Sequence, residues 1–302
     1  MMNHASNDEL TGVFPSAASR QSRWRAQREF LRRFLAQPLG VGAALIMLAL
    51  ILVAAFGSTI APSNPYQLGA ERLASPSWSH LFGTDHLGRD VLSRVIYGVK
   101  PSLTVALGAV AIGIVLGTTI GAVSGYIGGA FDLVAQRVMD ALQAFPSLFL
   151  GVLVLAVLSP SYLNVMIAIG VVITPAAQRV VRASTIAVKQ SDYISAAHVI
   201  GAQHRRVLLS HILPNIMSPI LVIASAELGS AILIAASLSF LGFGTPPPEP
   251  ALGSMVSGEG RQYMTQAPWL VLAPAVVISL AILAANFLGD ALRDVLDPRL
   301  RI

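Results

Sequence analysis

The chain has 302 residues, of which 54% are hydrophobic and 12% charged, with no cysteine and a formal net charge of +5. Soluble domains carry about twice this charged fraction, so the composition excludes an ordinary water-soluble surface. It also excludes intrinsic disorder, disulfides, thiol catalysis and cysteine-ligated metals.

Six long runs contain no Asp, Glu, Lys or Arg, and the longest has 38 residues, from 141 to 178. A helix that crosses a bilayer needs about 20 apolar residues, and backbone groups in lipid must pair internally. The sequence therefore predicts an all-α membrane protein with six transmembrane helices. We expect them at about 40–60, 101–124, 145–160, 163–182, 217–240 and 268–289. The third is the shortest, and we expect it to continue the amphipathic stretch 130–144.

The basic residues indicate the orientation of these helices. Fifteen of the 20 lysines and arginines lie in segments 1–39, 125–145, 178–214 and 290–302. Since basic segments stay on the cytoplasmic side, both termini are expected in the cytoplasm. The resulting division is a cytoplasmic basic tail over 1–37, a first transmembrane helix over 38–62, a periplasmic segment over 63–100 and a five-helix core over 101–302.

The tail allows two interpretations. Its six arginines fix the orientation of the first helix, or residues 20–35 form a basic helix on the inner leaflet. The apolar run begins near residue 40, too late for a cleavable signal peptide.

Motifs for catalysis and nucleotide binding are missing. The only lysines, Lys100 and Lys189, do not lie in the phosphate-binding pattern G-x-x-x-x-G-K-S/T. The zinc motif H-E-x-x-H and the nucleophile motif G-x-S-x-G are absent too. His204 and His211 are seven apart, but two imidazoles without a nearby acid are more often surface groups than a metal site. We expect no catalytic residue, no metal, no cofactor and no nucleic acid.

Two features lie within the apolar runs. Gly113, Gly117, Gly121 and Gly125 repeat every four residues, a spacing that lets two helices approach closely in lipid; the partner helix is left open. Glu227 is the only acid well inside a span. It either faces a pore or is a neutral, hydrogen-bonded packing residue.

The loop over 184–216 is long and patterned. Asp192 is expected to cap a short helix that carries Ile194, Ala197 and Ile200 on one face and offers Ala196 and Ala197 as a small flat surface. Gly201 then permits a left-handed turn. A second helix is expected to end at Pro214. The loop should thus form a helix–glycine–helix element just inside the membrane.

A charged segment precedes the second span. The spacing allows Asp85 to pair with Arg89 and Asp90 to pair with Arg94. These four residues form either an outer gate or receptor-docking surface, or a capped interfacial helix.

The loop pattern Ala-Ala-x3-Gly-x9-His-Ile-Leu-Pro, from Ala196 to Pro214, resembles the "EAA" loop of ABC-importer permeases. Ser195 stands where that family usually has Glu. Phe82 to Asp85 with Gly88 to Asp90, Ser237 to Gly242 and Asn286 to Asp290 are similar to segments of the peptide/nickel permeases, the dipeptide and oligopeptide "C" subunits. The resemblance covers about residues 35–302.

The resemblance implies a type I ABC importer (MetI-like) permease fold in a bacterial inner membrane. The ATPase-coupling loop would comprise Ser195, Ala196, Ala197, Gly201, His211, Leu213 and Pro214. Implied partners are a second homologous permease, cytoplasmic ABC ATPases that hold ATP and Mg²⁺, a periplasmic substrate-binding protein and membrane lipid. The expected cargo is a di- or oligopeptide or a related small solute. An ion-driven or passive carrier acting alone, and a membrane scaffold, remain alternatives.

Overall fold

The structure is a computed structural model that describes residues 28–29, 31–159, 161–244 and 248–296. Most of the predicted basic tail and the end of the chain lie outside these residues. The described part is almost entirely helical, and its one β-bridge joins Thr84 to Asp90.

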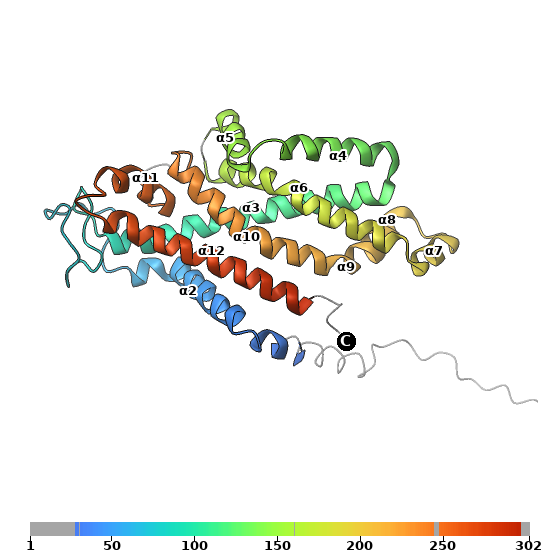
Figure 1. The fold of residues 1–302 in the computed structure, drawn as a ribbon, viewed down its shortest axis with the longest axis horizontal. Coiled ribbons are helices and arrows are strands. Elements are labelled where there is room, and N and C mark those ends of the chain that lie inside the picture. The colour runs from blue at the N-terminus through green and yellow to red at the C-terminus, as the bar shows by residue number, and fades with distance from the viewer. Residues whose placement is uncertain (1–27, 30, 160, 245–247, 297–302) are drawn as a thin grey trace, which may run out of the picture.

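Among the described residues, five helices are long and apolar enough to cross a membrane. They run roughly along the long axis of the molecule (Figure 1), so that the segments predicted to lie outside gather at one end and the loop after α6 at the other. Following the predicted orientation, we call these the outer and the inner end. Their bounds are α2 (Pro38–Ile60), α3 (Val91–Ile127), α6 (Tyr162–Lys189), α10 (Met217–Phe240) and α12 (Trp269–Leu296).

The predicted third span is not one helix. Helix α5 (Ser147–Leu158) has 12 residues, about 18 Å at 1.5 Å per residue, which is too short for a bilayer. It follows α4 (Gly129–Gln143) after a bend of 97°. Helix α5 agrees with the predicted position 145–160 but is too short to cross a bilayer alone, so six spans result when this bent pair counts as one.

The second span starts ten residues earlier than predicted. Asp90 caps α3 by accepting a hydrogen bond of 2.8 Å from the Ser93 N–H, and the helix continues through Pro101 to Ile127. Ser102 Oγ donates to Gly98 O at 2.8 Å, the kind of local side-chain bond that helps helices in lipid tolerate proline. The predicted periplasmic segment therefore contains the first turns of α3.

The glycine stripe of α3 packs against α6 of the same chain. A Cβ at Gly117 would lie 2.6 Å from Ala177 Cβ, and one at Gly121 would lie 2.6 Å from Gln178 O. The contacts advance along both helices in the same direction, so α3 and α6 are parallel. The glycine stripe therefore allows a close backbone contact, and the helix on which it packs is α6.

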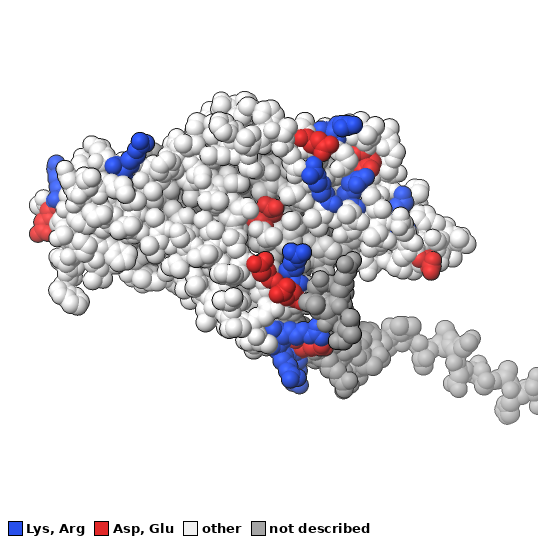
Figure 2. All heavy atoms as spheres, in the orientation of Figure 1, with Lys and Arg blue, Asp and Glu red and all other residues white. Residues whose placement is uncertain are grey.

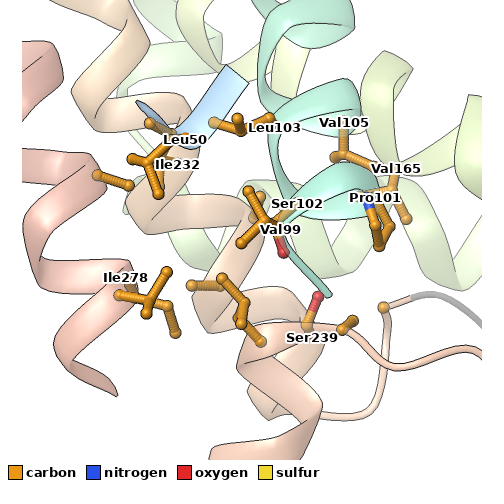
Figure 3. Close-up of a pocket in the computed structure, with 17 residues that line it drawn as sticks. Leu50, Val99, Pro101, Ser102, Leu103, Val105, Val165, Ile232, Ser239 and Ile278 are labelled. Carbon is orange, nitrogen blue, oxygen red and sulfur yellow. The ribbon is translucent and has the colours of Figure 1, made fainter. Parts of the chain in front are cut away.

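A second layer is formed by α2, α10 and α12. Gly289 of α12 lies against Ser225 O of α10, and Gly40 of α2 lies against Ala291 of α12. Where α2, α3, α6, α10 and α12 meet, apolar side chains surround a cavity of about 30 Å³ (Figure 3). This volume suits about one water molecule and not a solute.

The distribution of charged side chains on the surface agrees with the charge-free runs of the sequence. A broad uncharged band separates the charges near α11 (Leu252–Gln262) from those toward the other end of the molecule (Figure 2). An uncharged band across a helical bundle is where lipid tails contact a membrane protein.

Replacing Gly117 by Leu tests the α3–α6 contact. Overpacking costs about 1–3 kcal/mol, so we expect Gly117→Leu to lower the apparent melting temperature of the purified protein by several degrees. Gly42→Leu in α2 is the matched control, because nothing lies within 4 Å of a Cβ there. Equal melting temperatures for the two variants would contradict the close contact.

Candidate functional site

The loop between α6 and α10 folds into the expected helix–glycine–helix element, which we call the coupling element (residues 192–215). It comprises α7 (Asp192–Val199), a turn at Gly201, and one continuous helical run through α8 (His204–Arg206), the π-helical turn η1 (Val207–Ile212) and α9 (Leu213–Asn215). It lies at the inner end of α3 and α6 (Figure 1).

Gly201 forms the turn as predicted, with φ of +82°. Ala202 N–H donates to Ala197 O and Gly201 N–H to His198 O, both at 2.9 Å. This pair of bonds is the Schellman motif, which places a left-handed residue after a helix and favours glycine there.

One side of the coupling element is buried. Ile194 of α7 and Val207 and Ile212 of η1 are at most 1% exposed. They join side chains from the inner halves of α3, α6 and α10 in one apolar cluster, the inner cluster. Its remaining members are Ala122, Tyr126, Val181, Ile216 and Ile220. The element is therefore packed onto three long helices.

Polar contacts around Tyr126 reinforce this packing. His198 Nδ1 donates to Ile194 O at 2.8 Å, because a carbonyl only accepts. The Tyr126 hydroxyl lies within hydrogen-bond distance of two imidazoles, 3.2 Å from His198 Nε2 and 2.7 Å from His204 Nδ1. Lys189 Nζ donates to Tyr126 O at 2.6 Å. The end of α3 is thus bonded to α6, α7 and α8.

Two local predictions are wrong. Ser191, not Asp192, is the N-cap of α7, and no side chain bonds at this cap. Ile200 is 84% exposed because α7 ends at Val199 and the next residue leaves the helical face. The second helix ends at Asn215, one residue after the predicted Pro214.

The other side of the coupling element is not covered by other residues that the structure describes. Ser195 and Ala196 are exposed on α7, and Val199 is 87% exposed. Ala197, predicted to share this surface, is buried at 7% exposure. In the second half, Pro214 is exposed and His211 and Leu213 are half-buried. An apolar surface of this kind at the inner end suits a protein partner.

The four charged residues of the outer segment lie together and are buried. Asp85 is 1% exposed, Asp90 5%, Arg94 8% and Arg89 9%. Asp85 Oδ2 accepts from Arg89 Nε at 2.6 Å, and Asp85 Oδ1 accepts from the backbone N–H groups of Leu87 and Arg89 at 2.9 Å. The Asp85–Arg89 pair is confirmed.

The Asp90–Arg94 pair is wrong. Arg94 Nε lies 3.6 Å from Asp85, while Asp90 accepts from Ser93 and lies 3.0 Å from His80 Nδ1. The Asp90 carboxylate is already bonded to the first turn of α3, where backbone N–H groups have no partner within the helix. The cluster therefore fastens the outer segment to α3, and a hollow of about 300 Å³ opens beside it.

Glu227 lies half-buried in α10. Among the described residues, no ion pair or hydrogen bond is formed by its carboxylate. Beside it, residues 226, 230, 233 and 237 form a stripe on one face of α10, and Ala226, Ser230 and Leu233 on this stripe are exposed. The stripe carries two serines, and the hydroxyl of Ser237 donates to Leu233 O at 2.8 Å.

Sequence reasoning missed the bonding role of Tyr126, Lys189, His198 and His204. One signal was present: the two histidines lie three residues before and three after Gly201, so a chain reversal there brings both rings to the same side. Within the described ranges, no group of three or more His, Asp or Glu side chains could hold a metal ion.

Comparison with known proteins identifies the family. The model of the family described as "Binding-protein-dependent transport system inner membrane component" matches residues 113–302. The chain belongs to this family. A second model, the N-terminal transmembrane domain of oligopeptide transport permease C, matches residues 23–76.

Named relatives of this transport family agree. The dipeptide transport system permease protein DppC of Alkalihalophilus pseudofirmus is 40% identical over 97% of this chain and 93% of its own length. The glutathione transport system permease protein GsiD of Pectobacterium atrosepticum is 41% identical over 91% of each chain. The chain is thus a permease subunit of an ABC importer and a transport component, not an enzyme. The family implies, in general terms, ATPase and substrate-binding partners.

A solved structure supports the fold. An inward-facing form of the MetNI methionine ABC transporter aligns with a TM-score of 0.50 at 17% identity, covering 66% of this chain and 96% of that chain. The predicted MetI-like fold is confirmed, and the chain is an integral membrane protein.

Replacing Asp85 by Asn separates a structural role of the outer cluster from receptor docking. Removing one partner of a buried ion pair costs about 3–5 kcal/mol, so Asp85→Asn should lower the melting temperature and the amount of folded protein. Glu71→Gln, at an exposed position, is the control and should change neither. An Asp85→Asn variant with normal stability but weakened receptor binding would favour docking instead.

Proposed function

We propose that the chain forms half of the translocation pathway of an ATP-driven importer for di- or oligopeptides or a related small solute. A second homologous permease supplies the other half, cytoplasmic ATPases hold ATP and Mg²⁺, and an extracytoplasmic binding protein delivers the solute. The relatives named above are permeases for a dipeptide and for glutathione, both small peptides, which supports this substrate class.

The observation that carries the proposal is the coupling element, which is buried on one side and open on the other. Closure of the ATPases pushes on the exposed face around Ser195 and Ala196. The inner cluster and the bonds of Tyr126 pass the displacement to α3, α6 and α10. Each state is a stable packing of the bundle, and ATP shifts the balance between the two.

Two features support a pathway that is shared between two subunits. The cavity between the helices of the single chain has room for about one water molecule and not for a solute. Helix α10 exposes the serine-bearing stripe next to Glu227. We infer that this stripe faces the second permease across the pathway.

The turn at Gly201 provides the decisive test. A left-handed conformation costs an L-residue about 1–2 kcal/mol, and asparagine accepts it far better than leucine. In the reconstituted importer, Gly201→Leu should reduce uptake and substrate-stimulated ATP hydrolysis by about tenfold, while Gly201→Asn should keep most of both.

The measurement is uptake into proteoliposomes, with size-exclusion profiles showing that both variants still assemble. Normal uptake by Gly201→Leu would remove the coupling role. Uptake by the purified chain without any ATPase would instead support a carrier acting alone.

We further propose that both termini lie in the cytoplasm of a bacterial cell whose inner membrane holds the protein. Because the chain has no cysteine, a single introduced thiol shows on which side of the membrane its residue lies. Trp78→Cys, at a site 98% exposed in the outer segment, should react with a membrane-impermeant maleimide in intact cells. Ala130→Cys, exposed at the start of α4, should react only after permeabilisation. The reverse pattern would invert the topology.

A further inference from the structure

A pocket of about 580 Å³ lies at the base of the coupling element. Its lining comes from the inner end of α3, the last residue of α6, and from α7, α8 and η1: Val123, Tyr126, Ile127, Lys189, His198, His204, Arg205 and Leu208. It is open to the surface and distinct from the exposed face of α7 that carries Ser195 and Ala196.

One half of this pocket is cationic. The lining includes Lys189 and Arg205, which each carry a positive charge, and two imidazoles, but no Asp or Glu. Lys189 is held in place by its bond to Tyr126 O, whereas no ion pair or hydrogen bond to another described residue engages Arg205. Such a set of donors suits a phosphate group.

The other half is apolar. Val123 and Ile127 lie one turn apart on α3, Leu208 is half-buried beside them, and Ile127 is 60% exposed. These side chains continue from the charged half onto α3, which is a membrane-spanning helix. A soluble phosphate compound would gain nothing from this surface, whereas an acyl chain would be removed from water by it.

We propose that this pocket binds an anionic phospholipid of the inner leaflet. The phosphate lies against Lys189 and Arg205, and the first part of an acyl chain follows Val123 and Ile127. The site is at the inner end of the bundle, where headgroups meet water and basic side chains attract anionic lipids.

The bound lipid would join three parts that move during transport. Its contacts come from α3, α6 and the coupling element, the same elements that the Tyr126 bonds connect. The lipid would therefore strengthen the connection between the coupling element and the bundle. This consequence rests on the proposed function, and the choice of the inner leaflet rests on the proposed orientation, but the binding itself rests on neither.

Lipid retention by the purified complex tests the site. The complex is placed in nanodiscs of phosphatidylcholine with a minor fraction of phosphatidylglycerol, and the phosphatidylglycerol retained after detergent exchange is counted by native mass spectrometry. Arg205→Gln should reduce retention about fivefold, as expected for one basic side chain at a membrane surface. Arg206→Gln is the matched control: it removes the same charge from the same short helix, but Arg206 does not line the pocket.

The inference is overturned if the two variants retain phosphatidylglycerol equally, or if the wild type retains phosphatidylcholine as well. It is also overturned if millimolar inorganic phosphate displaces the lipid, since this would indicate a site for free anions, or if no lipid is retained in the complex, since a protein partner would then fill the pocket. Because the readout is lipid content, a failed uptake experiment does not affect it.

Discussion

The close contact between α3 and α6 determines how the rest of the structure is arranged. Where α3 has glycine, its backbone approaches α6 closely enough that a side chain at Gly117 or Gly121 would collide with the neighbouring helix. In lipid no hydrophobic force draws two helices together, so close packing of small residues is the main source of association. A pair held this tightly moves as one body.

This pair connects the two clusters of polar residues. Helix α3 has 37 residues, about 55 Å at 1.5 Å per residue. Asp90 and Arg94 at its start belong to the outer charge cluster, and Tyr126 near its end bonds to the coupling element. A displacement of the coupling element therefore reaches the outer segment through one continuous helix and not through a chain of loops.

The sequence predicted the spans well wherever the absence of charge decided the outcome. The predicted fifth span, 217–240, agrees with α10, and the glycine spacing of α3 correctly indicated a packing face. The third span was placed correctly at α5, but the bend of 97° from α4 was not predicted, because it depends on which surfaces α4 and α5 cover. Pro146 marks where the helix breaks, but a proline carries no information on the direction that the chain takes next.

Inside the coupling element, the motif located the turn but not the buried faces. Helical spacing assigned Ile200 to the same face as Ile194 and Ala197. That assignment assumes that the helix extends to residue 200, whereas the Schellman motif at Gly201 ends it one residue earlier. Periodicity predicts a face only within the bounds of the helix, and these bounds are the least certain part of a sequence prediction.

In the charged cluster of the outer segment, a hydrogen bond made by Asp90 prevents the ion pair that was predicted for it. Asp85 and Asp90 each have an arginine four residues later, and the spacing rule treats the two pairs alike. Asp90 is also the N-cap of α3, where an orphan N–H lies at short range, so its carboxylate is used there and Arg94 turns to Asp85. Asp85 and Asp90 thus bond within the outer segment and the first turn of α3, while one side of the coupling element is not covered by other described residues. In the proposed mechanism, the force of the ATPases therefore enters the bundle at the coupling element, and the outer segment follows the movement of α3.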